Sequence, residues 1–168
     1  MKIIKLIIIL LVILIPQNLF ADDLKAENLE LFMGKWSTNC ASDNENKCAL
    51  ERSVSIDKEM KKKLITVIMQ TELPSKKVRF VLISPLGTLI PSGVKIGFDG
   101  KFISDKAYSF NICRLIGCIT SMMVKDETLE RFKKANDLNL EYVGANGQKI
   151  NINFDLKGFT KELEKILK

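Results

Sequence analysis

Two cysteines flank a four-residue segment between stretches of alternating apolar and polar side chains, and this pattern constrains the fold more than any other. Cys113 and Cys118 enclose residues 114–117. Cysteines on either side of so short a loop can lie opposite each other in an antiparallel strand pair, where the Cα separation suits a disulfide. We therefore predict a β-hairpin closed by its own disulfide.

The register of this hairpin predicts one inward-facing apolar side and one largely polar side. The predicted pairs on the apolar side are Ile112 with Ile119, Phe110 with Ser121, and Tyr108 with Met123. Asn111 and Thr120 would share the polar side.

The first 21 residues have the layout of a secretory signal peptide. Lys2 and Lys5 precede the apolar run 7–15, and Ala21 is a small residue suited to cleavage. The apolar run is shorter than the roughly 20 residues of a membrane-spanning helix. We expect residues 1–21 to be removed, 22–33 to form a polar lead-in and 34–168 to form a single domain.

The four cysteines all follow the predicted signal peptide. An even number of cysteines in an exported chain favours disulfides over metal binding or catalysis. We favour Cys40 with Cys48 and Cys113 with Cys118, because each pair closes a local turn. A crossing pair that joins the two hairpins remains an alternative.

Short alternating segments follow one another along the rest of the chain and predict a β-rich fold. We expect strands at 34–40, 48–56, 64–71, 77–84, 94–98, 101–104, 107–113, 118–124, 138–143 and 149–156. About nine or ten such strands favour an all-β sandwich of two sheets, with a closed barrel as the alternative. A short helix through Lys134, capped by Asp126, and an amphipathic helix from Phe159 complete the prediction.

Local patterns also predict how some strands pair. Asp99-Gly100 is a strong signal for a two-residue hairpin turn. Matching the apolar faces pairs Ile65 with Leu82, Val67 with Phe80, Met69 with Val78, Leu138 with Phe154, Leu140 with Ile152 and Tyr142 with Ile150. Trp36 is expected to pack in the core or at its rim rather than to form a ligand platform.

The composition argues against several classes of function. The chain has no histidine, which excludes Ser-His-Asp and Cys-His catalysis and the usual zinc sites. We assign no catalytic, cofactor-binding or metal-binding residue and do not expect an enzyme, with a hydrolase that uses paired carboxylates as an alternative. After residue 21 the net charge would be a mild +4, with 24 basic and 20 acidic residues, and no interleaved aromatics indicate nucleic-acid binding.

Several motifs resemble the invasion-associated locus B proteins of Gram-negative bacteria. The motifs are Trp36-x3-Cys40, Cys48, Pro85-Leu86-Gly87, the run 93–100, Cys113-x4-Cys118 and Gly158-Phe159. The resemblance spans nearly all of the chain after the signal peptide. It implies an exported periplasmic or outer-membrane-associated protein with an immunoglobulin-like β-sandwich, linked in pathogenic members to host-cell invasion. The resemblance carries no catalytic or ligand residue onto this chain.

We therefore expect a non-enzymatic envelope protein that binds another envelope component or supports envelope integrity or host interaction. Its interaction surface would lie at the loop tips around Leu115-Ile116 and Leu89-Ile90, unless these side chains fold back onto the rim of the sandwich. An alternative is a periplasmic carrier of a small apolar ligand. Its cavity between the sheets would be lined by Phe80, Phe98, Phe110 and Phe154.

Overall fold

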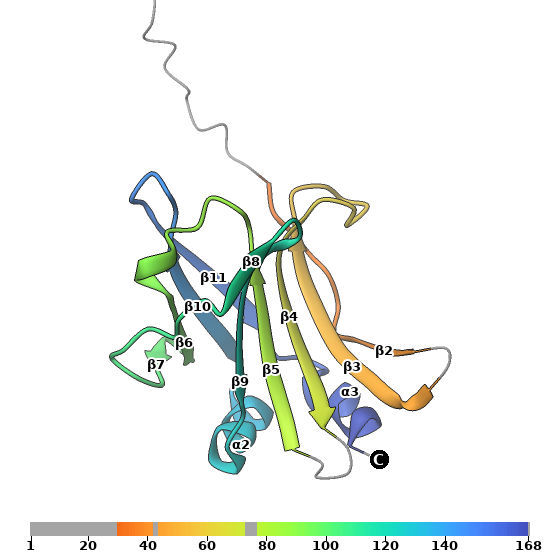
Figure 1. The fold of residues 1–168 in the computed structure, drawn as a ribbon. Coiled ribbons are helices and arrows are strands. Elements are labelled where there is room, and N and C mark those ends of the chain that lie inside the picture. The colour runs from red at the N-terminus through yellow and green to blue at the C-terminus, as the bar shows by residue number, and fades with distance from the viewer. Residues whose placement is uncertain (1–29, 42–43, 73–76, 168) are drawn as a thin grey trace, which may run out of the picture.

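The computed structural model describes residues 30–41, 44–72 and 77–167. The predicted signal peptide and residues 22–29 of the predicted lead-in lie outside the described residues. Antiparallel strands in two sheets make up most of the fold, together with two short helices (Figure 1). Within the described part of the chain, neither helix is long and apolar enough to cross a membrane.

The structure has eleven strands among the described residues, where the sequence predicted about nine or ten. The strands are β1 (Phe32–Met33), β2 (Ser37–Ala41), β3 (Asn44–Ser55), β4 (Lys63–Glu72), β5 (Lys77–Ser84), β6 (Val94–Phe98), β7 (Lys101–Phe102), β8 (Ile112–Arg114), β9 (Gly117–Met123), β10 (Asp137–Val143) and β11 (Lys149–Asp155). The helices are the 3-10 turn η2 (Ile90–Ser92), α2 (Asp126–Lys134) and α3 (Phe159–Ile166).

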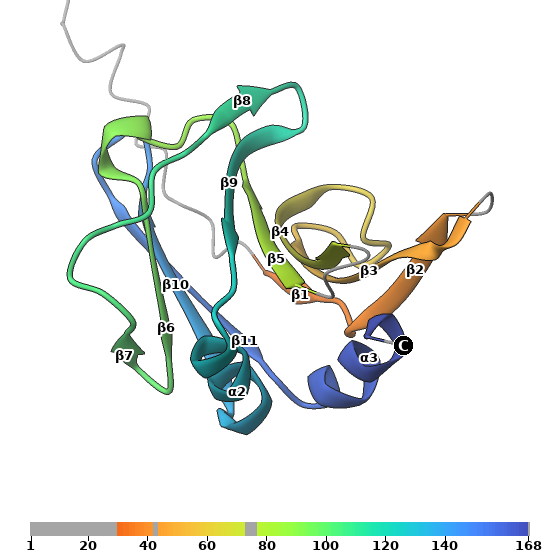
Figure 2. The ribbon, with the colours of Figure 1, turned by 60° about the horizontal axis from the view of Figure 1, so that its bottom comes forward.

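The two sheets form a β-sandwich, as predicted, and not a closed barrel. The larger sheet has the order β1-β3-β4-β5-β9-β8, with β2 also paired to β3, and the smaller sheet has the order β11-β10-β6-β7. Figure 2 shows that the sheets diverge toward one end, where α2 and α3 lie between them. Each sheet buries one face, so its strands alternate between buried and more exposed side chains.

The predicted pairing of β10 with β11 and the predicted turn at Asp99-Gly100 are confirmed. In β10 and β11, Leu138 pairs with Phe154, and Tyr142 pairs with Ile150. The turn between β6 and β7 consists of Asp99 and Gly100, which both have positive φ angles of 48° and 79°. Two successive residues with positive φ are the requirement of a type I′ hairpin turn.

The predicted register of β4 and β5 is wrong by two residues. Val67 pairs with Leu82 and Met69 with Phe80, whereas we expected Val67 to lie opposite Phe80. A shift of two leaves every side chain on its original face, because side chains alternate with a period of two. The apolar pattern is therefore satisfied by both registers and does not distinguish them.

The predicted orientation of the stapled hairpin is also wrong. Ile112 pairs with Ile119 as expected, but this pair faces outward and Ile112 is 46 % exposed. The inward side of β9 carries Thr120, which pairs with the buried Leu82 of β5 and is itself buried. The pairing with β5 decides which face of β9 is buried.

The strand predicted before Cys113 is also shorter than expected. Strand β8 begins at Ile112, and Tyr108 bridges to Val94 of the smaller sheet instead of pairing with Met123. The segment before β8 thus crosses from one sheet to the other. Because of this crossing, residues 107–111 do not form a strand paired with β9, which the sequence predicted.

Two further boundaries differ from the prediction. Phe32–Met33, in the segment expected to be a polar lead-in, forms β1 and pairs with β3. Helix α2 covers the predicted range, but Asp126 is its first residue and the N-cap is Lys125, which makes no side-chain cap. A carboxylate in the first helical turn still stabilises the helix through the helix dipole.

Aromatic side chains join both sheets and both helices in the core. Phe132 of α2 has its ring centroid 5.9 Å from that of Phe80 in β5, 4.7 Å from that of Phe98 in β6 and 5.4 Å from that of Phe159 in α3. The ring centroid of Trp36 lies 5.0 Å from that of Phe159, and Trp36 is buried, as predicted. We call Trp36, Phe80, Phe98, Phe132, Phe154 and Phe159 the aromatic cluster.

This packing contradicts the expected carrier cavity between the sheets. Phe132 occupies the space between Phe80 and Phe98, and all three side chains are buried. Phe154 is also buried and packs near Trp36, whereas Phe110 is only partly buried at the margin of the core. Three of the four residues expected to line a cavity are therefore core residues, and Phe110 packs against their margin.

Truncation of Phe132 tests the role of the aromatic cluster. We expect Phe132→Ala to lower the free energy of unfolding by roughly 3–5 kcal/mol, because it removes a buried ring and leaves a cavity. Urea denaturation followed by far-UV circular dichroism measures this change. The exposed Phe102 is the matched control, and Phe102→Ala should cost much less. Similar losses for both variants would contradict a special role of α2 in holding the sheets together.

Candidate functional site

The turn between β8 and β9 presents two aliphatic side chains to solvent. Leu115 is 96 % exposed and Ile116 is 68 % exposed, so neither folds back onto the sandwich to become buried. Cys113 and Cys118 form a disulfide at the base of the turn, with an S–S distance of 2.00 Å and a Cα separation of 3.9 Å. The second disulfide joins Cys40 to Cys48. These are the two pairs favoured from the sequence.

Gly117 lets this turn lie close to the end of β5. A Cβ atom at this position would lie 2.2 Å from the backbone oxygen of Ser84, and the φ of Gly117 is 133°. Both features favour glycine, since a side chain would meet backbone that cannot move aside. The turn is thus held from two sides, by the disulfide and by close contact with β5.

A groove with a volume of about 410 Å³ lies between the hairpin turn and the loop that joins β3 to β4. Ile116 lines it together with Leu64, Ile68 and Ile83 of the outer sheet face and with Lys61, Lys62 and Lys63. Lys63 pairs with Glu51 at 3.4 Å and Lys61 pairs with Glu59, while no ion pair involves Lys62 among the described residues. Aliphatic and cationic side chains therefore share this groove with one acid, Glu51.

The second predicted segment lies at the same end of the sandwich (Figure 1). Leu89 is 39 % exposed and Ile90 is 52 % exposed. The neighbouring Leu86, which the sequence reasoning did not select, is 59 % exposed. The segment is held by a hydrogen bond from the backbone N–H of Leu89 to the oxygen of Val143. We call the end that carries Leu86, Leu89, Ile90, Leu115 and Ile116 the hairpin end.

The structure places both predicted loop tips at the hairpin end, as the sequence analysis expected, and adds the lysine run 61–63 beside one of them. The groove beside the turn contains Ile116 but neither Leu89 nor Ile90, so the two predicted tips are neighbouring surfaces and not one pocket. The missed contribution is the lysine run 61–63, which the sequence analysis did not select as part of the surface. The signal in the sequence that could have identified it is three consecutive lysines directly before the predicted strand 64–71.

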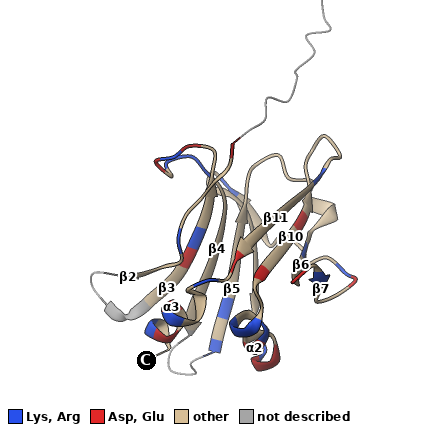
Figure 3. Cartoon of the chain, turned by 180° about the vertical axis from the view of Figure 1, so that it is seen from behind, with Lys and Arg blue, Asp and Glu red and all other residues tan. Residues whose placement is uncertain are grey.

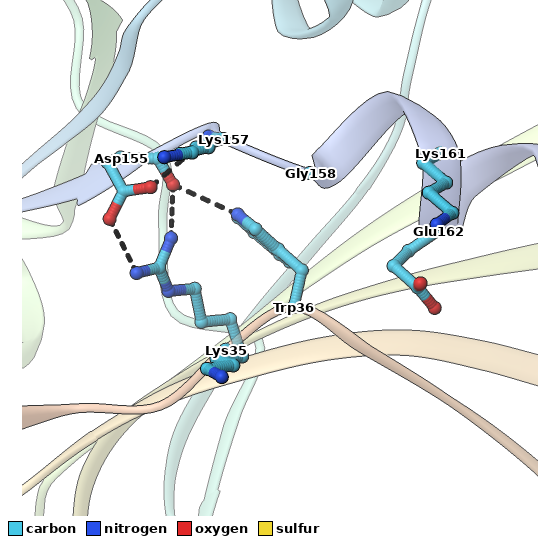
Figure 4. A pocket seen from close by; sticks show the side chains of 8 residues that line it. Lys35, Trp36, Asp155, Lys157, Gly158, Lys161 and Glu162 are labelled. Atoms are coloured by element: carbon cyan, nitrogen blue, oxygen red, sulfur yellow. Dashed lines mark hydrogen bonds and ion pairs between the residues drawn. The ribbon is translucent and has the colours of Figure 1, made fainter.

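A separate pocket of about 450 Å³ lies near the opposite end, beside the start of α3 (Figure 4). Its centre is Arg52, a buried cation on the inner face of β3. Arg52 donates from Nε to the oxygen of Gly34 at 2.7 Å, from Nη1 to the backbone oxygen of Asp155, and from Nη2 to Oδ2 of Asp155 at 2.6 Å. Trp36 Nε1 donates to the same backbone oxygen at 2.9 Å.

These bonds indicate a structural role for the centre of the pocket. Arg52 belongs to the larger sheet and Asp155 to the smaller sheet, so their ion pair links the two. The Arg52 guanidinium lies 5.6 Å from the centre of the Trp36 ring, which adds a cation–π contact. Because the guanidinium is already bound by oxygen atoms of the protein, it is poorly placed to bind a ligand.

The acids of this pocket are not suited to donate a proton. The hydrogen bond from Arg52 lowers the pKa of Asp155, and the hydrogen bond from Lys165 lowers the pKa of Glu162. A carboxylic acid that protonates a leaving group at neutral pH needs a raised pKa instead. The pocket therefore gives no support to the carboxylate hydrolase. Among the described residues there is also no group of three or more potential metal ligands.

Basic residues lie near both the groove beside the hairpin turn and the pocket beside α3. Figure 3 shows Lys and Arg on the loop between β3 and β4, and also on α2 and α3 at the opposite end. Lys35, Lys157 and Lys161 line the pocket beside α3 and are exposed. Cations lie next to acids at both ends, as Lys165 does with Glu162 and Lys63 with Glu51. At the hairpin end the cations also lie next to exposed aliphatic side chains.

The Arg52–Asp155 pair makes the stability of the fold depend on pH. Because its pKa is lowered in the folded state, the Asp155 carboxylate stabilises the protein above its ordinary pKa of 3.8, and this contribution is lost as the pH falls through the lowered value. We expect Asp155→Asn to reduce stability at neutral pH and to weaken the loss of stability in acid. Urea unfolding followed by Trp36 fluorescence, from neutral pH to below 3.8, measures both effects. The exposed Asp105 is the control, and Asp105→Asn should keep the wild-type profile.

Comparisons with known proteins agree with this geometry. A crystal structure of invasion associated protein B from Bartonella henselae has a similar fold, with a TM-score of 0.65 over 81 % of this chain and 96 % of that chain, at 17 % sequence identity. No curated protein matches the sequence significantly. The family model for the invasion associated locus B (IalB) protein matches residues 36–167, which begin at Trp36 of the aromatic cluster and include both disulfides. The chain therefore belongs to the invasion associated locus B family.

Proposed function

We propose that this chain is an exported envelope protein that acts by binding another envelope component through its hairpin end. The observation that carries the proposal is the exposure of Leu115 and Ile116 on a turn fixed by a disulfide. Exposed aliphatic side chains on a rigid turn have no role in packing the core. Clusters of this kind on soluble domains are often interaction sites.

Export is supported by the sequence and by the sulfur chemistry. Residues 1–21 have the pattern of a signal peptide, and the four cysteines form two disulfides, which persist in oxidising compartments such as the periplasm. Membership of the invasion associated locus B family points to the envelope as well. A periplasmic protein, with or without attachment to the outer membrane, fits these observations.

A binding role fits the described residues better than catalysis does. The carboxylates in the pocket beside α3 have lowered pKa values and are engaged by cations. The buried polar side chains of the larger sheet also bond to one another, as Ser53 does with Thr66 at 2.9 Å. We therefore propose recognition by an exposed surface and not reaction in a cleft.

Crosslinking in intact cells tests this proposal without assuming a partner. A photo-crosslinking amino acid at Leu115 should capture a specific envelope component, identified by mass spectrometry. The same amino acid at the exposed Phe102, which lies on β7 away from the hairpin end, should not capture it. Equal capture from both positions, or none from Leu115, would contradict binding through the hairpin end.

A second test uses substitution at the turn itself. We expect Leu115→Ser with Ile116→Ser to reduce recovery of the crosslinked component from envelope extracts by at least tenfold, which corresponds to about 1.4 kcal/mol of binding free energy. The melting temperature should stay within a few degrees of the wild type, because both side chains are exposed. Unchanged recovery together with unchanged melting would remove the turn from consideration.

A further inference from the structure

Exposed apolar side chains are unevenly distributed over the molecule. Among the described residues, eleven large hydrophobic side chains are exposed, and six of them lie in residues 86–90 and 112–116. A seventh, Ile56, is the first residue of the loop that leads to the lysine run 61–63. The exposed apolar surface is therefore concentrated near the hairpin end.

Positive charge exceeds negative charge beside the same surface, although Lys61 and Lys63 are ion-paired with Glu59 and Glu51. Residues 56–63 contain four lysines and two acids, and Arg114 precedes Leu115 in the turn. Asp57 accepts hydrogen bonds from the backbone N–H groups of Lys61 and Lys62, which fixes this end of the loop. The side chains of Lys61, Lys62 and Lys63 then line the groove that contains Ile116. The cations and the aliphatic turn thus lie together.

We propose that the hairpin end binds an anionic phospholipid surface, with Leu115 and Ile116 entering the layer of headgroups and the lysine run contacting phosphates. This inference rests on the proposed function and names the class of its partner. Aliphatic side chains that enter a membrane interface and lysines that contact anionic headgroups contribute to the same binding event. The exposed Leu86 and Ile90 would provide a second point of contact.

The composition of the surface favours lipid over protein as the partner. Protein interfaces are enriched in aromatic residues, Met and Arg and depleted in Lys. The hairpin end instead combines Leu and Ile with three consecutive lysines. Leu115 also projects from the apex of a turn and is 96 % exposed, which suits insertion into a soft headgroup layer. A protein partner would require a pocket that receives it.

Vesicle flotation tests the proposal. The oxidised protein from residue 22 onward is the suitable sample, because residues 1–21 are apolar and would enter lipid themselves, and the described fold begins after them. We expect flotation with vesicles of equal parts phosphatidylcholine and phosphatidylglycerol, little flotation with phosphatidylcholine alone, and weaker flotation as salt is raised. Equal flotation with both vesicles, or none with either, would overturn the proposal.

Variants separate the two contributions to lipid binding. We expect Leu115→Ser with Ile116→Ser to weaken partitioning roughly tenfold or more, and each Lys→Gln change at positions 61, 62 and 63 to weaken it by about fivefold. The controls are Phe102→Ser for the apolar change and Lys157→Gln for the charge, since both residues are exposed away from the hairpin end. Flotation that is insensitive to the turn and lysine variants would contradict the proposal.

The outcome also distinguishes this inference from the function on which it rests. If the wild-type protein does not float but Leu115 crosslinks specifically to a protein in cells, binding through the hairpin end holds and the lipid partner is wrong. If neither occurs, both proposals fail. Flotation together with lipid-linked products at Leu115 supports both.

Discussion

The packing of Phe132 between the two sheets is the interaction on which the rest of the structure depends. The sheets diverge toward the end that holds α2 and α3, and without the helices their inner faces would be open to water there. The ring of Phe132 contacts the larger sheet at Phe80, the smaller sheet at Phe98 and the second helix at Phe159. One buried side chain thus connects four elements, and dispersion contacts of this density are what a close-packed interior supplies.

The sequence predicted those parts of the fold that local chemistry determines. The turn at Asp99-Gly100 and the pairing of Leu138 with Phe154 are determined by residues within about twenty positions of each other along the chain. The register of β4 and β5 was wrong because a shift of two preserves every face. The orientation of the stapled hairpin was wrong because β5, more than thirty residues earlier, decides which side of β9 is buried.

The two candidate sites also differ in how far local sequence could predict them. The hairpin turn could be predicted because two cysteines and a glycine within six residues define it. The ion pair of Arg52 with Asp155 joins residues separated by 103 positions, and no local pattern reports such a contact. A charged residue between the inward-facing Leu50 and Val54 was the available signal, since a buried cation requires a partner.

Rigidity explains why the exposed turn is informative about function. A flexible loop could turn Leu115 and Ile116 toward the sandwich and bury them, which would lower the free energy of the isolated protein. The disulfide and the close approach of Gly117 to Ser84 oppose that movement. The structure therefore holds aliphatic side chains in water at one end while the aromatic cluster secures the other. Under the proposed function, a turn that is ordered before binding would lose less entropy on binding, which is consistent with a stapled apolar tip on an otherwise well-packed domain.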